Sequence, residues 1–303
     1  MGKIAFVFPG QGAQSAGMGL ELYNHFDSAK SIFDLAGENV KKVTFEGPQE
    51  ELNLTINAQP CLFAVDLAAA AALNEKGVFA DGVAGFSLGE VPGLVHSGLL
   101  SLEQGLEFVN FRAQAMHECA TQDKGGMFAV LGLDADGIAK ACAEVEGAYP
   151  ANFNCMGQIV AACSEDSAID LKNVVAANGG RLMRLAASGA FHSPFMDKAK
   201  DEIEKYLKTV QFGDMKVPAY SNVTAEVYDN PKELIARQVN SPVLWQKTIE
   251  NMIGQGFDTF IEVGPGKTLT GLIKKINKDV RTFHVYDLET LENVINSIGD
   301  NNA

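Results

Sequence analysis

The chain has 303 residues, of which 47% are hydrophobic and 20% charged, as in an ordinary globular protein. This balance excludes collagen, coiled-coil and disordered classes, and the length supports either one large domain or a main domain carrying a smaller one. The net charge of −14 repels phosphate backbones and argues against nucleic-acid binding.

No apolar run is long enough to span a bilayer, and the most apolar stretch, residues 59–73, is interrupted by Asp66, which favours a buried core helix. The five cysteines show no C-x-x-C spacing, which is typical of reduced thiols and not of a disulfide or zinc framework. The first residues enter a strand-like run without a signal-peptide pattern. We therefore expect a cytoplasmic protein with no metal, no cofactor and no membrane partner.

The first part of the chain alternates short apolar runs with longer helical patterns. Strands are expected at residues 4–8 and 82–86, and helices at 28–40, 58–76, from Leu88 onwards and at 102–119. The helix that begins at Leu88 meets Pro92 early, so it is expected to kink unless its first turn accommodates the missing N–H. This alternation predicts an α/β fold with a mainly parallel sheet.

The pattern changes between residues 126 and 188. The expected elements there are a strand (127–131), a helix (135–145), two strands (151–154 and 158–163), a helix (167–178) and a strand (181–185). This β-α-β-β-α-β order is that of a ferredoxin-like unit. We therefore expect a small domain, residues 126–188, inserted into a larger domain formed by residues 1–125 and 189–303.

The larger domain is expected to resume with a helix at residues 194–209. Strands follow near 218–222, 259–263 and 282–286. The tail after Asn293 is expected to fray.

The strongest local motif is Gly85-x-Ser87-x-Gly89, which stands between an apolar strand and a helical pattern. Small residues on both sides allow the sharp turn that exposes a serine hydroxyl at the start of a helix. There, backbone N–H groups and the helix dipole stabilise developing negative charge. The motif predicts that Ser87 is the covalent nucleophile of an acyl-transferring enzyme, and the alternative is a glycine-rich turn with an incidental serine.

A serine nucleophile needs a base, and the chain has five histidines. His192 lies in a loop of small residues, 188–194, that leaves the inserted domain, and such junctions often carry functional sites. His284 lies in the apolar run 282–286, which favours a core or surface role, although a serine hydrolase with the chain order Ser…Asp/Glu…His would use it. We prefer His192 as the base.

Arg112 stands in an amphipathic helical pattern, where an arginine usually faces solvent. In a cleft, its guanidinium would instead recognise a carboxylate through two parallel hydrogen bonds. The sequence leaves both interpretations open.

Several motifs, in the same order and at similar separations, resemble the bacterial malonyl-CoA:acyl-carrier-protein transacylase family of fatty acid synthesis. The resemblance covers nearly the whole chain and rests on FVFPGQG (6–12), GFSLGE (85–90), NFN (152–154), GAFH (189–192), NSPVLW (240–245) and EVGPGK (262–267). The family implies an α/β-hydrolase-like core with a parallel sheet and an inserted ferredoxin-like small domain, in agreement with the order of elements above.

The resemblance also implies a reaction, the transfer of a malonyl group from malonyl-CoA to the phosphopantetheine thiol of acyl carrier protein. The transfer would be ping-pong, through a malonyl ester on Ser87. His192 would be the general base and then the general acid, oriented by the backbone carbonyl of Gln238. The backbone N–H groups of Gln11 and Leu88 would form the oxyanion hole.

The same resemblance assigns substrate contacts. Arg112 would bind the free carboxylate of the malonyl group, and Phe191 would crowd a branched acyl group. Asn154, Gln158 and Arg181 would contact the substrate or the phosphopantetheine arm of the carrier. Acyl carrier proteins are acidic, so lysine clusters at residues 198–208 and 274–281 are candidates for transient electrostatic docking, although a solvated helix face also explains them.

Two positions depart from the family pattern, because Phe86 and Val91 stand where relatives carry His and Tyr. The change at Phe86 removes a polar group from beside the nucleophile. Two rival functions are a serine hydrolase that uses His284 and a non-catalytic docking module of a larger synthase. The combination of Ser87, His192 and Arg112 favours the transacylase over both.

Overall fold

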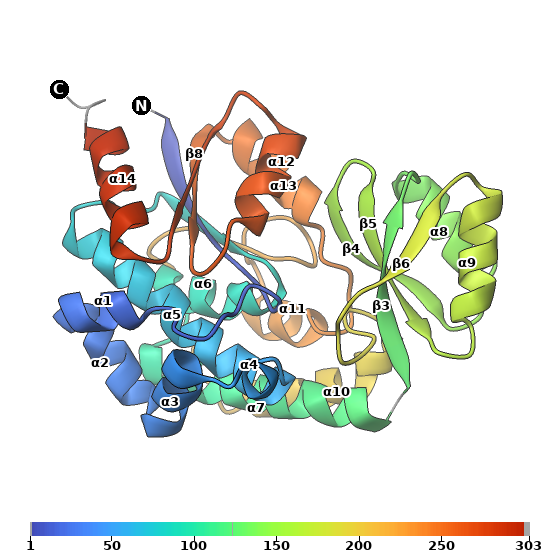
Figure 1. Cartoon of the computed structure of the whole chain (residues 1–303), viewed down its shortest axis with the longest axis horizontal. Helices are drawn as coiled ribbons and strands as arrows, with labels where there is room; N and C mark the ends of the chain where they lie inside the picture. Colours follow the sequence, from blue (N-terminus) through green and yellow to red (C-terminus); the bar gives the residue numbers. More distant parts are fainter. Residues whose placement is uncertain (1, 123, 300–303) are drawn as a thin grey trace. The chain divides into compact units, whose positions relative to one another are not determined.

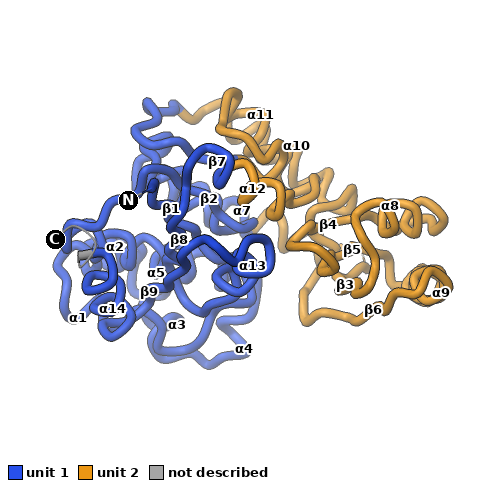
Figure 2. The backbone as a smooth tube through the Cα atoms, turned by 90° about the horizontal axis from the view of Figure 1, so that it is seen from above, with its two compact units in different colours: residues 1–113, 211–220, 252–303 blue, residues 114–210, 221–251 orange. Residues whose placement is uncertain are grey.

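The computed structural model describes residues 2–122 and 124–299, and the chain divides into two compact units. The first comprises residues 1–113, 211–220 and 252–303, and the second comprises residues 114–210 and 221–251 (Figure 2). The second unit thus contains the predicted small domain, residues 126–188, together with chain segments on both sides of it. Each unit has its own sheet.

The first unit contains a five-stranded sheet whose paired strands are all parallel. Its strand order is β7-β2-β1-β8-β9, with β7 (Ala219–Tyr220), β2 (Gly82–Gly85), β1 (Lys3–Phe8), β8 (Phe257–Val263) and β9 (Arg281–Val285). Ala5 to Phe8 of the central strand have no exposed surface, as expected for a parallel sheet that is covered on both faces. The predicted α/β fold with a parallel sheet is confirmed.

Helices surround this sheet (Figure 1). They are α1 (Leu20–His25), α2 (Asp27–Ala36), α3 (Glu38–Glu46), α4 (Gln49–Leu52), α5 (Thr55–Glu75), α6 (Glu90–Ser97), α13 (Thr268–Ile276), α14 (Leu288–Gly299) and the first part of α7 (Leu102–Gln122). α6 packs against β1, β2 and β7, whereas α13 and α14 pack against β9.

Two expectations for this unit were wrong. The single helix predicted at residues 28–40 is divided into α2 and α3, because Gly37 adopts a left-handed φ of 94° that ends one helix and precedes the next. The tail predicted to fray after Asn293 continues as α14 to Gly299, and residues 300–303, which the prediction also covered, lie outside the described residues. Leu291, Val294 and Ile298 recur at helical spacing and are buried, so packing of this apolar face holds the helix in place.

The apolar stretch at residues 59–73, for which a buried core helix was predicted, belongs to α5. Among the described residues, α5 is the one helix long and apolar enough to cross a membrane, yet 83% of its most apolar window is buried by the rest of the protein. α2 and α3 pack along it. Its burial is that of a central core helix.

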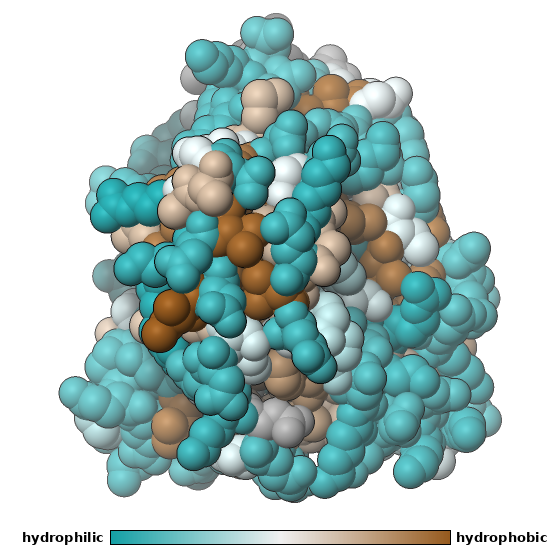
Figure 3. Space-filling view, turned by 90° about the vertical axis from the view of Figure 1, so that its right-hand side faces the viewer, coloured by the Kyte–Doolittle hydropathy of each residue, from teal (hydrophilic) through white to brown (hydrophobic). Residues whose placement is uncertain are grey.

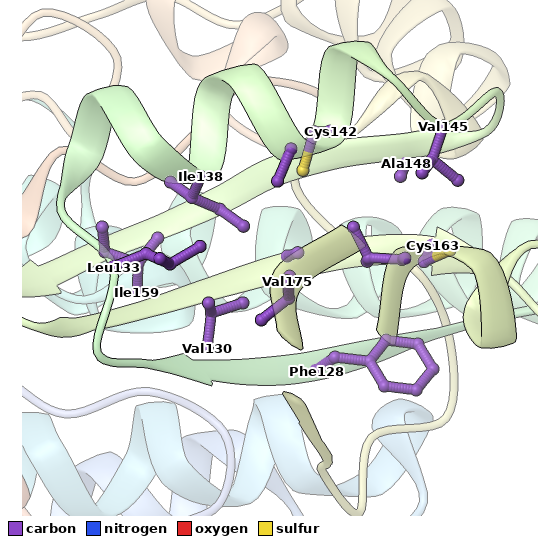
Figure 4. Packing of buried hydrophobic residues seen from close by; sticks show 13 residues of the cluster. Phe128, Val130, Leu133, Ile138, Cys142, Val145, Ala148, Ile159, Cys163 and Val175 are labelled. Atoms are coloured by element: carbon purple, nitrogen blue, oxygen red, sulfur yellow. The ribbon is translucent and has the colours of Figure 1, made fainter. Parts of the chain in front are cut away.

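The second unit contains a four-stranded antiparallel sheet of order β4-β5-β3-β6. The strands are β3 (Gly125–Leu131), β4 (Ala148–Cys155), β5 (Gln158–Ser164) and β6 (Arg181–Arg184), with α8 (Ala135–Ala143) after β3 and α9 (Ala168–Ala177) after β5. This is the predicted β-α-β-β-α-β order. Both helices close an apolar core on one face of the sheet, which includes Val130, Ile138 and Val175 (Figure 4).

The rest of the second unit is helical. It contains η2 (Pro194–Met196), α10 (Asp197–Leu207), α11 (Pro231–Arg237) and α12 (Trp245–Gly254). η2 and α10 lie within the predicted helix at 194–209, whereas α11 and α12 were not anticipated. α10 packs against α11.

A buried acid lies in the middle of α5. Asp66 has no exposed surface, and neither of its carboxyl oxygens has a hydrogen-bond partner among the described residues. Burial raises the pKa of this carboxyl well above its usual range, and the nearby Glu262 adds to the shift. Glu262 accepts hydrogen bonds from the backbone N–H groups of Leu269 and Thr270, at 3.0 and 2.7 Å, at the start of α13. The surroundings of Asp66 therefore favour the neutral acid.

The substitution Asp66→Asn is expected to make the stability of the fold less sensitive to alkali. The folded-state pKa of Asp66 lies above the ordinary value of 3.8, so the stability from its bound proton is fully present below that value and is lost as pH rises through the folded pKa. Asn does not titrate. Between about pH 5 and about pH 8, the melting temperature of the variant should fall less than that of the parent. The exposed Asp166→Asn serves as the control, and parallel curves for parent and Asp66→Asn would contradict the prediction.

Candidate active site

Ser87 begins a short 3-10 turn, η1 (Ser87–Gly89), that joins β2 to α6. Its φ is 53°, a left-handed conformation that costs a non-glycine residue free energy. A Cβ on Gly85 would lie 2.0 Å from the carbonyl carbon of Gly89, and a Cβ on Gly89 would lie 2.1 Å from the backbone oxygen of Phe8. Both glycines of the motif are therefore required by close backbone approach.

The predicted kink at Pro92 does not interrupt the helix that follows. α6 begins at Glu90, so Pro92 falls in its first turn. N–H groups there have no acceptor within the helix, and a proline removes nothing that the helix needs. The nucleophile turn thus leads directly into a regular helix.

Arg112 is buried and lies next to the predicted nucleophile. Only 2% of its surface is exposed. Its Nη2 donates to Ser87 Oγ at 3.3 Å, and its Nη1 donates to Gln59 Oε1 at 2.6 Å. Of the two interpretations that the sequence left open, the solvent-facing one is excluded. A guanidinium in this position can bind a carboxylate on a group attached to the serine.

The loop after β1 lies against the nucleophile turn within the first unit. A Cβ on Gly10 would come within 2.6 Å of the backbone oxygen of Phe86, the residue before Ser87. The Phe86 ring also lies against Gly10, at 3.1 Å from that Cβ position. Gln11 follows in this loop, and Leu88 lies buried in η1. The two residues predicted to form an oxyanion hole therefore lie on adjacent segments.

Sequence reasoning missed two polar residues of α5. Thr55 Oγ1 accepts a hydrogen bond from Gln11 Nε2 at 3.0 Å, and Gln59 holds Arg112 as described above. Both residues are 99% buried. A glutamine inside an otherwise apolar helical stretch, directly before Pro60, was the signal that could have identified Gln59.

His192 lies in the second unit, where it is 3% exposed and has a φ of 58°. Its Nδ1 lies 2.9 Å from the backbone oxygen of Gln238. A carbonyl oxygen can only accept, so Nδ1 carries the proton and Nε2 is the basic nitrogen. The Gln238 side chain donates to Asn222 Oδ1 at 3.4 Å. The contact between His192 and the Gln238 carbonyl is the one that the family resemblance implied.

His284 is poorly placed to serve Ser87. It lies in β9, in one cross-strand row with Glu262 of β8, Val7 of β1 and Ala84 of β2. Three strand spacings separate the ends of this row, which is about 14 Å. His284 instead stacks on Tyr286, with ring centroids 5.8 Å apart. This arrangement disfavours the serine hydrolase alternative.

His96 is a half-buried residue of α6 that packs on aromatic side chains of β1. Its ring lies 5.3 Å from the ring of Phe6 and 6.0 Å from that of Phe8. Burial lowers its pKa to about 4. It is therefore neutral near pH 7 and packs as an aromatic side chain.

Three residues predicted to contact substrate or carrier lie on the small sheet. Gln158 pairs with Leu131, and Leu131 pairs with Arg181, so Gln158, Leu131 and Arg181 form one row across β5, β3 and β6. The side chains of Gln158 and Arg181 are then on the same face, about 10 Å apart. Asn154 is 7% exposed and sits at an irregularity of β4. Its Oδ1 has no hydrogen-bond partner among the described residues. Phe191, next to His192, is buried.

Comparison with known proteins gives a consistent result. A family model described as "Acyl transferase domain" matches residues 5–291. The chain is 40% identical to "Malonyl CoA-acyl carrier protein transacylase" of Bacillus subtilis, over 100% of this chain and 99% of the relative. It is 38% identical to the protein of the same name from Staphylococcus aureus strain MRSA252, over 97% and 98%.

Solved structures agree with these relatives. The malonyl CoA-acyl carrier protein transacylase of Clostridium perfringens superposes with a TM-score of 0.95 at 35% identity, over 98% of each chain. A malonyl-transacylase solved in complex with a type II PKS acyl-carrier protein superposes with a TM-score of 0.93 at 33% identity, over 97% of this chain and 99% of that one.

Two glycine substitutions test the close approach at the nucleophile turn. Gly89→Ala is expected to lower the free energy of unfolding by about 3 kcal/mol, because its Cβ would meet the Phe8 carbonyl at 2.1 Å. Gly93→Ala, one turn later, is the control, since its Cβ would make ordinary van der Waals contacts with the Phe8 ring, at 3.6 Å, and with the Val83 side chain, at 3.8 Å. That variant should be neutral or gain up to about 1 kcal/mol from helix propensity. Denaturant unfolding measures both, and equal stabilities would refute the steric argument.

Proposed function

Because the chain belongs to the malonyl CoA-acyl carrier protein transacylase family, we propose that it transfers a malonyl group from coenzyme A to the phosphopantetheine thiol of an acyl carrier protein. The observation that carries this proposal is the buried guanidinium of Arg112, 3.3 Å from Ser87 Oγ. A fixed cation beside the nucleophile suits an acyl group that bears its own carboxylate. A hydrolase of neutral esters has no use for it.

The reaction proceeds in two half-reactions through an ester on Ser87. In the first, Ser87 Oγ attacks the thioester carbonyl and its proton passes to Nε2 of His192. The N–H groups of Gln11 and Leu88 stabilise the oxyanion. Collapse of the intermediate breaks the carbon–sulfur bond, and the coenzyme A sulfur takes the proton from the imidazolium. In the second half-reaction, the carrier thiol gives its proton to Nε2 of His192 and its sulfur attacks the ester carbonyl. Collapse breaks the bond to Ser87 Oγ, which takes that proton from the imidazolium.

Two observations support His192 as the base. Ser87 and His192 are two of the three described non-glycine residues with positive φ, and such strain is concentrated at functional sites. The hydrogen bond from Nδ1 to the Gln238 carbonyl also sets the tautomer that a base needs. His192 is therefore preferred to His284.

Residues of the second unit contact the parts of the substrate that lie beyond the reacting atoms. Gln158 and Arg181 hold the phosphopantetheine arm, and the Asn154 Oδ1 accepts a hydrogen bond from it. The amide N–H groups of the phosphopantetheine arm are hydrogen-bond donors, and the buried Asn154 Oδ1 requires such a donor. Phe191 restricts the volume available to a branched acyl group. Malonyl is accordingly preferred to methylmalonyl.

The partner of the second half-reaction is an acidic carrier protein. A relative has been solved in complex with an acyl-carrier protein, and the lysines at residues 198–208 and 274–281 are the candidates to bind such a partner. Of these, Lys200 also pairs with Asp201 and Glu204 of its own helix. Figure 3 looks onto the right-hand side of Figure 1 and shows apolar side chains among mostly hydrophilic ones. The large apolar residues exposed in the second unit are Leu131, Met156, Ile169, Met183 and Leu185. Docking is transient and electrostatic.

Membership of the family also indicates the type of fold and the location in the cell. We infer an α/β-hydrolase-like core around the parallel sheet, with residues 126–188 as an inserted ferredoxin-like domain. The strand order β4-β5-β3-β6 and the two helices on one face support the second assignment. We also infer a cytoplasmic enzyme, because both of its substrates occur there.

Single-turnover labelling tests the nucleophile and its base. Mixing the protein with malonyl-CoA should add one malonyl group to Ser87, seen by mass spectrometry, and adding carrier protein should remove it. Ser87→Ala should give no adduct, and His192→Ala should slow acylation by at least about a hundredfold. His284→Ala should stay within about twofold of the parent, since its ring packs away from the site. Loss of acylation in His284→Ala alone would overturn the assignment.

Replacing Arg112 tests the substrate class. Arg112→Ala is expected to lower kcat/KM for malonyl-CoA by about a hundredfold, because charge-assisted hydrogen bonds to the carboxylate are lost. Acylation by acetyl-CoA, which has no carboxylate, should change far less. Arg237→Ala on the surface of α11, where the side chain is 46% exposed, is the control and should leave both rates unchanged. Equal losses for the two donors would contradict the role of Arg112.

A further inference from the structure

The loop that carries Gln11 has no regular structure of its own. It joins β1 to α1 over residues 9–19 and contains four glycines, of which Gly12 has a left-handed φ of 107°. Many conformations are open to such a loop, so contacts from outside must fix the position of any one of its N–H groups. On the side of Gln11 towards β1 the contact is steric, since Gly10 lies against Phe86. On the other side it is a set of hydrogen bonds.

Three side-chain amides form these hydrogen bonds, and we call Gln14, Gln49 and Asn53 the amide clamp. Gln49 is the first residue of α4, and its Oε1 accepts from the N–H of Ala16 at 3.1 Å. Its Nε2 donates to the backbone oxygen of Gln14 at 3.3 Å and to Asn53 Oδ1 at 2.9 Å. One carboxamide outside the loop therefore binds the loop backbone at two points.

The amide clamp also binds the residue next to Gln11. Asn53 Oδ1 accepts a second hydrogen bond, from Gln14 Nε2 at 3.1 Å. Gln14 Oε1 in turn accepts from the N–H of Gly12 at 2.7 Å. This N–H belongs to the peptide group that follows Gln11, and Gly10 is fixed on the other side. Both neighbours of Gln11 are therefore held in place.

The helix that supports the amide clamp is itself well anchored. Leu52 of α4 has no exposed surface, and α4 packs against α3 and α5. Gln14 and Gln49 are half-buried, and Asn53 is exposed. A hydrogen bond at such a place contributes little to the stability of the fold. Loss of the clamp is therefore expected to change the position of the loop more than the folding of the chain.

From these contacts we propose that Gln49 and Asn53 are positioning residues for the oxyanion hole, which keep the loop where the Gln11 N–H can donate to the oxyanion. The proposal rests on the proposed function, because it takes the Gln11 N–H as an oxyanion donor. The oxyanion exists only during the reaction, and it forms with every acyl group. Loss of the clamp should therefore lower the maximal rate, leave the affinity for the donor unchanged and affect all acyl donors alike.

The test measures single-turnover acylation of Ser87 by malonyl-CoA and by acetyl-CoA. Gln49→Met keeps the length of the side chain and removes its hydrogen bonds, so the maximal acylation rate should fall about tenfold with both donors. The half-saturating donor concentration should stay within about twofold of the parent. Asn53→Ala removes the acceptor shared by Gln14 and Gln49 and should slow acylation by about fivefold. Asn53→Asp keeps an oxygen acceptor there and should recover to within about twofold of the parent.

Gln104→Met is the matched control. Gln104 is also a half-buried glutamine that binds two backbone groups with one carboxamide. It accepts from the N–H of Ser101 at 2.9 Å and donates to the backbone oxygen of Gln211 at 3.0 Å. Both partners lie outside the loop at residues 9–19, so the acylation rate should stay within about twofold of the parent.

The yield of the Ser87 adduct is recorded together with the rate, because loss of stability alone would reduce the yield and leave the rate of the folded fraction unchanged. That result in Gln49→Met, or a loss confined to one donor, would overturn the proposal. So would a loss in Asn53→Asp equal to that in Asn53→Ala. Should Gln49→Met fail to fold by circular dichroism, the two variants of the exposed Asn53 decide in the same way. Failure of the parent itself to form an adduct would refute the proposed function, which is a separate result.

Discussion

The site depends on a steric constraint, the near-contact of the turn after β2 with the end of β1. The Gly89 Cα lies so close to the Phe8 carbonyl that no side chain fits between them, and Gly85 and Gly89 approach each other as closely. Because the turn is so tight, Ser87 is forced to a φ of 53°, and its hydroxyl stands at the start of α6 beside Arg112. Packing of β1 and β2 on both faces stabilises a conformation that the serine would not adopt alone.

Electrostatics adds a second constraint. Arg112 is among the largest fully buried side chains, and Asp66, in the same core, is a buried acid. The two buried side chains differ in whether they keep their charge. Burial and Glu262 raise the pKa of Asp66, so its charge is suppressed, whereas an arginine keeps its proton at any ordinary pH. A charge that cannot be removed by titration is suited to binding a substrate anion, since it does not vary with conditions in the cell.

Local sequence patterns predicted most of the fold and the tight turn that carries the proposed nucleophile. Apolar runs between glycines identified the strands, and Gly85-x-Ser87-x-Gly89 identified the turn, because both depend on neighbouring residues. Elements whose stability depends on distant packing were missed or misjudged, as with α12 and the end of α14. Thr55 and Gln59, the two polar residues of α5 that contact Gln11 and Arg112, were missed for the same reason. Gln59 and Arg112 are 53 positions apart, and only the packing of α5 and α7 makes them partners.

The acceptor that orients His192 belongs to the backbone at position 238. Every amino acid supplies this oxygen, so evolution can vary the side chain there without removing the acceptor. The oxygen also carries no full charge. In the reaction proposed above, an imidazolium formed next to it lacks the electrostatic stabilisation that an aspartate would provide, and so it releases its proton readily to a departing sulfur. Thiols are easy leaving groups that need little assistance, and a weakly held proton matches the proposed exchange of one thioester for another.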